Sequence, residues 1–329
     1  MRKSLPLLLS LILGIILFYW ITNIIGWKEI KNAFLVFSYW QGLIVLLITI
    51  SVALVGALRW KEVLKGEGVL ISLKDVIKPY LAGSSIVFLT PVIFWGDEVF
   101  QGYALKEKYS VPWTKGIASI AIERILEYTG KIPLIFFSIL FFIQKISPIP
   151  PKVVIILGGI FLLLGIFIII FYFKAFKKES IVRFFLRTFS LLERNGANSV
   201  LDIEKEIFNF FHLTKTTTRR AFGLTFLRVA LMILRTWVLI LFLGKNLGIL
   251  ATVFILGFSY LATSIPIPAA LGSHEAFQVL AFNSLGLGAQ TAAAFAIIIR
   301  VSELIIALIG LWFLFRLGTG ILAKNILKD

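Results

Sequence analysis

Long apolar runs make up most of the chain, and several of them are long enough to cross a membrane. The runs cover residues 4–27, 32–58, 113–144, 153–173 and 221–243, and two more, 276–299 and 304–315, flank Arg300 and Glu303. An α-helix rises about 1.5 Å per residue, so roughly 20 apolar residues cross a hydrocarbon layer about 30 Å thick. The pattern therefore predicts an all-α, polytopic membrane helical bundle that forms a single membrane domain over 1–329. The first run follows a basic N-terminus, but it is too long for a signal peptide and lacks a small-x-small cleavage site, so we expect a retained span.

Two further apolar segments, 79–110 and 248–286, are interrupted by residues that break helices. The interrupting residues are Pro91, Gly96, Pro266, Pro268 and Gly272. Broken backbone is tolerated at membrane depth only where protein or a water-filled cavity covers it. We therefore expect each segment to enter the membrane and return as a re-entrant hairpin that turns at its Pro and Gly positions.

The distribution of positive charge predicts the orientation of the chain. Ten Lys or Arg residues lie within 174–220, and other basic clusters occupy the N-terminus, 59–78 and the C-terminus. Loops rich in Lys and Arg remain on the cytoplasmic side. All these clusters can be cytoplasmic only if the two interrupted segments do not cross. This predicts six full spans with both termini in the cytoplasm, and two amphipathic helices at the membrane interface over about 175–220.

The interrupted segments belong to a pattern that occurs twice in the chain. Each copy contains an arginine, a Pro–Gly–carboxylate break and an R-x-x-E sequence inside the next apolar run. The charged members are Arg59, Glu98, Arg124 and Glu127 in the first copy and Arg235, Glu275, Arg300 and Glu303 in the second. Each arginine precedes its counterpart by 176 positions. We expect repeat 1 at about 41–144 and repeat 2 at about 221–318, in inverted topology, with both R-x-x-E sequences near the bilayer midplane.

Charged residues inside a membrane are costly, so their recurrence in two copies indicates a functional site. Arginine binds phosphate through two parallel hydrogen bonds and stays charged in an apolar setting. We therefore expect the four arginines to contact an anionic head group, and the four glutamates to orient those arginines or to gate with protons. The alternative from the same residues is that each R-x-x-E sequence forms an ion pair that locks the bundle.

Composition narrows the remaining chemistry. The net charge of +16 fits cytoplasmic loops of a membrane protein, so we expect no nucleic-acid partner. Cysteine is absent and there are only two histidines, which argues against a metal centre, and His274 beside Glu275 is a weak metal signal. No phosphate-binding Gly-rich loop occurs, so we expect no nucleotide cofactor and indeed no cofactor at all.

The quoted motifs also resemble those of a known family. They are Thr90-Pro91…Gly96-Asp97-Glu98, Glu123-Arg124-x-x-Glu127, Pro266-x-Pro268…Leu271-Gly272-x-x-Glu275 and Arg300. They look like the transmembrane region of lysylphosphatidylglycerol synthases, a flippase-like domain, over roughly residues 5–320. The family usually has Gly-Gly-Glu and Pro-Gly-Gly where this chain has Gly96-Asp97-Glu98 and Pro268-Ala269-Ala270. These departures bear on the substrate more than on the fold.

The resemblance implies movement of a lipid between leaflets, while a separate soluble domain of the two-part members attaches the amino acid. This chain ends at Asp329, so we expect no aminoacyl transfer, and a separate lipid-synthesising enzyme is a candidate partner. We expect a lipid flippase-like transporter of the cell membrane, with membrane lipids as partners. The alternatives are a transporter of a small soluble anion or ion, and an intramembrane lipid-modifying enzyme that uses Glu98, His274 and Glu275.

Overall fold

The structure is a computed structural model, and it is built from helices. It describes residues 38–89, 96–145, 151–177, 179–188, 197–212 and 215–326, together with Tyr19 and Lys28. No β-strand occurs in this part of the chain. The prediction of an all-α polytopic membrane bundle is confirmed. The first predicted span lies outside the described residues, apart from Tyr19.

Four described helices are long and apolar enough to cross a membrane. They are α3 (Tyr39–Gly66), α6 (Trp113–Lys145), α10 (Thr216–Phe242) and α13 (Ala289–Ile326). A fifth long helix, α7 (Pro151–Lys177), has 27 residues and covers the predicted span over 153–173. The number of six spans stays a prediction.

The two interrupted segments form pairs of shorter helices. The first pair is α4 (Leu73–Leu89) and α5 (Gly96–Tyr109); the second is α11 (Ile249–Thr263) and α12 (Ser273–Ser284), joined through the 3-10 turn η1 (Pro268–Ala270). The 17 residues of α4 extend only about 25 Å, which is less than the hydrocarbon thickness. The two re-entrant hairpins stay a prediction.

The breaks fall where the sequence analysis expects them. Pro91 lies outside the described residues, between α4 and α5, and Gly96 is the first residue of α5. Pro266 follows the end of α11, and Pro268 begins η1. Gly272 has φ 78°, a left-handed conformation that favours glycine, and it is the N-cap residue that precedes α12.

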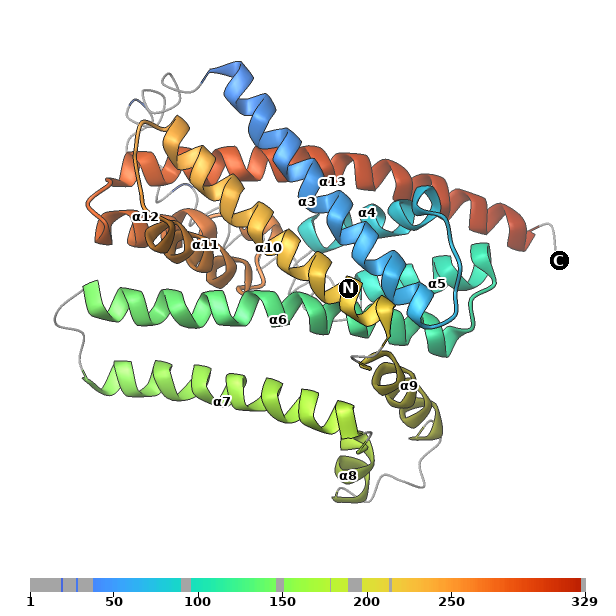
Figure 1. Cartoon of the computed structure of the whole chain (residues 1–329). Helices are drawn as coiled ribbons and strands as arrows, with labels where there is room; N and C mark the ends of the chain where they lie inside the picture. The colour runs from blue at the N-terminus through green and yellow to red at the C-terminus, as the bar shows by residue number, and fades with distance from the viewer. Residues whose placement is uncertain are drawn as a thin grey trace.

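The helices occur in two series of the same order. The series α3–α4–α5–α6 is followed by α10–α11–α12–α13, and equivalent helices begin 176 or 177 positions apart. Helices α3 and α10 pack side by side (Figure 1). Arg59 contacts Thr225 and Arg235 contacts Thr49, so the two helices are antiparallel. Figure 1 likewise shows α6 and α13 running in opposite directions.

The first helix of each short pair packs on the last long helix of the other series: α4 on α13, and α11 on α6. Glycines allow both close approaches. A Cβ on Gly310 would lie 2.1 Å from the carbonyl oxygen of Leu81, and one on Gly257 would lie 2.8 Å from that of Leu134. Leu81 and Gly257 are 176 positions apart, as are Leu134 and Gly310. The same pair of positions is therefore in contact twice. The glycine lies on the long helix in one contact and on the short helix in the other.

Outside the bundle, α8 (Ile181–Thr188) and α9 (Ala197–Phe210) form a small pair. The Glu204 carboxylate of α9 accepts hydrogen bonds from the backbone N–H groups of Ile181 and Val182, at 2.7 and 2.8 Å. Phe210, at the end of α9, is fully buried in a core cluster with Trp60 and Leu64. The position of α9 is therefore set by contacts with α6 and α7, and by Phe210 against Gly66 at the end of α3, as well as by its amphipathic pattern.

Where α9 packs under α3, it encloses the carboxyl group of Glu67. This residue follows the last residue of α3 and is 5% exposed. Burial, followed by the nearby carboxylate of Glu206, raises the pKa of Glu67 to about 8. The backbone oxygen of Glu67 accepts a hydrogen bond from the Lys115 ammonium group at 2.8 Å, which links the end of α3 to α6.

We expect Gly310→Ala to destabilise the protein by about 1–3 kcal/mol, because its Cβ meets the backbone of α4, which cannot yield without moving the helix. The measurement is the thermal midpoint in detergent. Gly223→Ala is the control, because a Cβ on that helical glycine meets no atom within 4 Å. A midpoint for Gly310→Ala equal to that of the control would contradict the close packing.

We expect Glu67→Gln to raise the thermal midpoint at pH 8 and to flatten its pH dependence. The pKa of this carboxyl is raised in the folded state to about 8 from 4.5, so the folded chain binds more protons than the unfolded chain between these values. Stability should therefore fall as pH rises from about 4.5 to 8. If the thermal midpoint depends on pH in the same way in the variant and in the unmutated chain, the pKa of Glu67 is not raised by folding.

Candidate functional site

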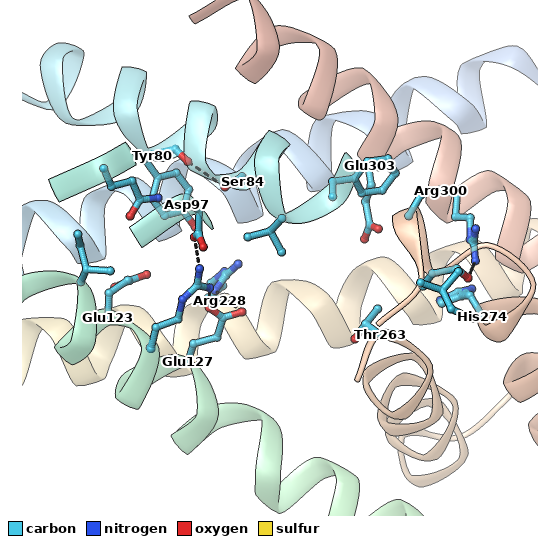
Figure 2. Close-up of a pocket in the computed structure, with 18 residues that line it drawn as sticks. Tyr80, Ser84, Asp97, Glu123, Glu127, Arg228, Thr263, His274, Arg300 and Glu303 are labelled. Carbon is cyan, nitrogen blue, oxygen red and sulfur yellow. Dashed lines mark hydrogen bonds and ion pairs between the residues drawn. The ribbon is translucent and has the colours of Figure 1, made fainter. Parts of the chain in front are cut away.

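Between the two pairs of short helices lies a cavity of about 260 Å³, here called the central cavity (Figure 2). Its charged lining comes from both series of helices and comprises Asp97, Glu123, Arg124, Glu127, Arg228, Arg300 and Glu303. Val87 and Thr263, near the ends of α4 and α11, also line it and are 176 positions apart. The cavity therefore lies where the breaks in the two helix pairs meet.

One side of the central cavity is built around Arg124 of α6. Its guanidinium forms ion pairs with Asp97, with Glu98 at 3.2 Å and with Glu127 at 3.3 Å. Asp97 and Glu98 lie in the first turn of α5, where the helix dipole stabilises negative charge. Arg228 of α10 is 3.8 Å from the Glu127 carboxylate. Figure 2 shows Asp97, Glu127 and Arg228 grouped on this side.

The opposite side is built around Arg300 of α13, which is 8% exposed. Its guanidinium donates to the Ala270 carbonyl oxygen, and to the Glu275 carboxylate at 3.1 Å. Ala269 and Ala270 both have positive φ, so η1 turns sharply beside Arg300. The N–H of Gly272 donates to Glu275 at 2.8 Å, which fixes this carboxylate at the start of α12.

Arg300 keeps donors that have no protein acceptor in the described part of the chain. Its Nε and Nη1 atoms are buried without a hydrogen-bond partner there, as is Nδ1 of His274. Buried polar atoms are normally hydrogen-bonded. Arg300 lines the central cavity, so an anionic ligand in it could accept hydrogen bonds from the Nε and Nη1 groups of this arginine.

Ion pairs recur between the two series. Arg124 pairs with Glu98 as Arg300 pairs with Glu275. In the same way, Arg235 contacts Thr49 at 3.4 Å and Arg59 contacts Thr225 at 3.4 Å. The carboxylate partners differ, because Arg235 binds Glu303 at 3.0 Å whereas Arg59 binds Glu123 rather than Glu127.

Arg59 is therefore placed differently from the prediction of a head-group contact. Its guanidinium donates to both carboxylate oxygens of Glu123, at 3.1 and 2.9 Å from Nε and 2.5 Å from Nη2, and the residue is 1% exposed. It does not line the central cavity. The pair with Glu123 joins α3 to α6.

The other predicted residues divide by position. Arg124, Glu127, Arg300 and Glu303 line the central cavity. Glu98 and Glu275 lie behind it and hold the two arginines. Within each R-x-x-E sequence the outcomes differ, because Arg124 pairs with Glu127 whereas Glu303 pairs with Arg235.

A second cavity of about 180 Å³, the side compartment, adjoins the first and is partly open at the surface of the bundle. The two share Tyr80, Ser84, Phe88, Arg228 and Glu303. The remaining walls come from α3, α10 and α13 and are mostly apolar: Thr49, Val52, Ala53, Met232, Arg235, Ile306 and Ala307. A partly apolar passage, which also contains Arg235 and Glu303, thus adjoins the charged cavity.

Sequence reasoning missed several lining residues, namely Asp97, Glu123, Arg228 and Tyr80. Arg228 had a readable signal, because it is a second charge inside the apolar run 221–243, two helical turns before Arg235. Glu123 is adjacent to Arg124, but its pairing with Arg59 depends on the approach of α3 to α6. Among the described residues, no group of three His, Asp or Glu side chains could hold a metal ion.

We expect Arg59→Met to lower stability by about 3–5 kcal/mol, because Glu123 is left as an unpaired buried charge. The double variant Arg59→Met with Glu123→Leu should recover most of this loss. Thermal unfolding of both variants in detergent measures the difference. If the single and double variants unfold together, the pair does not stabilise the fold.

Comparison with known proteins agrees with this architecture. The model of the lysylphosphatidylglycerol synthase transmembrane region matches residues 7–310. A UPF0104 membrane protein of Pyrococcus horikoshii is 25% identical over 341 residues, covering 99% of this chain and 98% of the relative. Another, of Methanocaldococcus jannaschii, is 23% identical over 269 residues, covering 79% of each chain. The chain is therefore a multi-pass membrane protein that belongs to the family of the lysylphosphatidylglycerol synthase transmembrane region.

Proposed function

We propose that this protein moves a phospholipid, or another lipid with an anionic head group, between the two leaflets of the cell membrane. The observation that carries this proposal is the junction of the central cavity with the side compartment. The head group would lie among the charged residues, while an acyl chain extends through the partly apolar passage to the bilayer. A transporter of a small soluble anion needs no such passage, which supports a lipid substrate over that alternative.

The donors of the cavity support an anionic group such as phosphate. Arg300 offers two buried nitrogen atoms without an acceptor in the described part of the chain, and guanidinium groups bind phosphate bidentately. The helices α5 and α12 also begin at the cavity, since Asp97 and His274 line it from their first turns. The positive ends of their dipoles therefore face the proposed site.

The charged side chains in and behind the cavity are balanced in number. The ion pairs contain six cations and six carboxylates: Arg59, Arg124, Lys131, Arg228, Arg235 and Arg300, with Asp97, Glu98, Glu123, Glu127, Glu275 and Glu303. An entering phosphate disturbs this balance at low dielectric, which is costly unless a proton or a cation accompanies it. The carboxylates on Arg124 are the candidate proton acceptors.

The transport geometry rests on a proposed inverted repeat of α3–α6 and α10–α13, with the helix pairs α4–α5 and α11–α12 as re-entrant hairpins. The equal spacing of helix starts, the antiparallel pairs and the exchanged glycine contacts support it. Both termini would then be cytoplasmic, as the basic clusters suggest. A separate enzyme would supply the lipid; no aminoacyl transfer is proposed for this chain.

We expect Arg124→Ala and Arg300→Ala each to reduce leaflet transfer to the rate of protein-free vesicles, because each removes a central cation of the cavity. The assay uses purified protein in vesicles containing fluorescent lipids with different head groups. Arg219→Ala, an exposed arginine before the apolar part of α10, is the matched control. Normal transfer in either cavity variant, with the protein correctly folded in the vesicles, would refute the proposed site.

A further inference from the structure

A third, much smaller cavity of about 10 Å³ lies between α3, α6, α10 and α11, and is here called the closed compartment. Seven of its eight lining residues are 176 positions from residues that line the side compartment. Those seven are Arg59, Glu127, Lys131, Thr225, Arg228, Val229 and Tyr260, the counterparts of Arg235, Glu303, Ala307, Thr49, Val52, Ala53 and Ser84. The two cavities therefore occupy equivalent places, one open and one filled.

Larger side chains fill the closed compartment. Lys131 stands where the side compartment has Ala307, and Tyr260 stands where it has Ser84. The Lys131 ammonium group is 2.5 Å from the Glu127 carboxylate and 5.5 Å from the centre of the Tyr260 ring. The Tyr260 hydroxyl in turn donates to the Met232 sulfur at 2.7 Å. These contacts occupy the space that is empty on the other side.

The arginine of each compartment is also held differently. In the side compartment, Arg235 binds Glu303. In the closed compartment, Glu127 is bound by Lys131 and Arg124, while Arg59 binds Glu123. Ile299 is the counterpart of Glu123, so the second series contains no carboxylate at this position. Arg59 thus binds Glu123, which lines the central cavity, while Glu127 shares the closed compartment with it. Only Glu127 corresponds to Glu303, the partner of Arg235.

We propose that the closed compartment is a second acyl-chain site, equivalent to the side compartment and serving the opposite leaflet, and that the Lys131–Glu127 ion pair keeps it shut. This inference rests on the proposed lipid transport. When Lys131 leaves Glu127, Arg59 can exchange Glu123 for Glu127 and adopt the pairing that Arg235 has with Glu303. One half then opens as the other closes, which is alternating access between inverted halves.

Single cysteine variants test the proposal, because the chain contains no cysteine of its own. Ala53→Cys reports on the side compartment and Val229→Cys on the closed compartment, at equivalent and half-buried positions. The reagent is a phospholipid with a maleimide on its acyl chain, in vesicles of phosphatidylglycerol and phosphatidylcholine. Leu54→Cys and Ala230→Cys, which are exposed neighbours of the two positions, serve as matched controls.

We expect Ala53→Cys to react about tenfold faster than Val229→Cys, relative to the controls, and Lys131→Ala to remove this difference by opening the closed compartment. The reciprocal variant Ala307→Lys should slow the reaction of Ala53→Cys, since it places a lysine beside Glu303. A variant that merely loosened the bundle would speed the labelling of Ala53→Cys, so slower labelling cannot arise in that way.

Equal labelling of Ala53→Cys and Val229→Cys in the unmutated background would overturn the inference. So would a Val229→Cys that stays protected in the Lys131→Ala background. The labelling requires no leaflet transfer, so it is separate from the function of the central cavity. Absence of transfer by the unmutated chain in vesicles would instead overturn the proposed function.

Discussion

The structure depends on charge-paired arginines inside an apolar bundle. An unpaired guanidinium or carboxylate in this setting would cost several kcal/mol, so each arginine must meet an acid from another element. Arg59 binds Glu123 across α3 and α6, and Arg235 binds Glu303 across α10 and α13. Since the partners lie on different helices, these pairs fix the helix positions as well as neutralising charge. The same ion pairs place polar groups inside the apolar bundle.

The two series of helices pack against each other through two equivalent contacts. Helix α4 lies on α13, and α11 lies on α6. Gly310 and Gly257 bring the backbones of these helices together. Within a lipid bilayer the hydrophobic effect does not drive helices together. Van der Waals contact between closely approaching backbones stabilises their association instead. The exchange of partners brings the breaks of both pairs to one central cavity. Neither series could line that cavity alone.

Differences between the series are as informative as their likeness. Arg300 retains unsatisfied donors, whereas Arg124 is surrounded by Asp97, Glu98 and Glu127. One side of the cavity is thus poised to accept an anion and the other is already neutralised. The side compartment is open while its counterpart is filled.

The sequence by itself determined the all-α membrane class, the long apolar helices, the breaks at Pro266, Pro268 and Gly272, and the recurrence of the charged positions. Hydrophobic run length and backbone restriction are local properties, which is why they are legible along the chain. Only the tertiary structure decided which acid each arginine meets, that Arg59 is withdrawn from the cavity, and that Arg228 lies in it. Ion pairs between helices depend on distances across the bundle, and no spacing along a single helix encodes those distances.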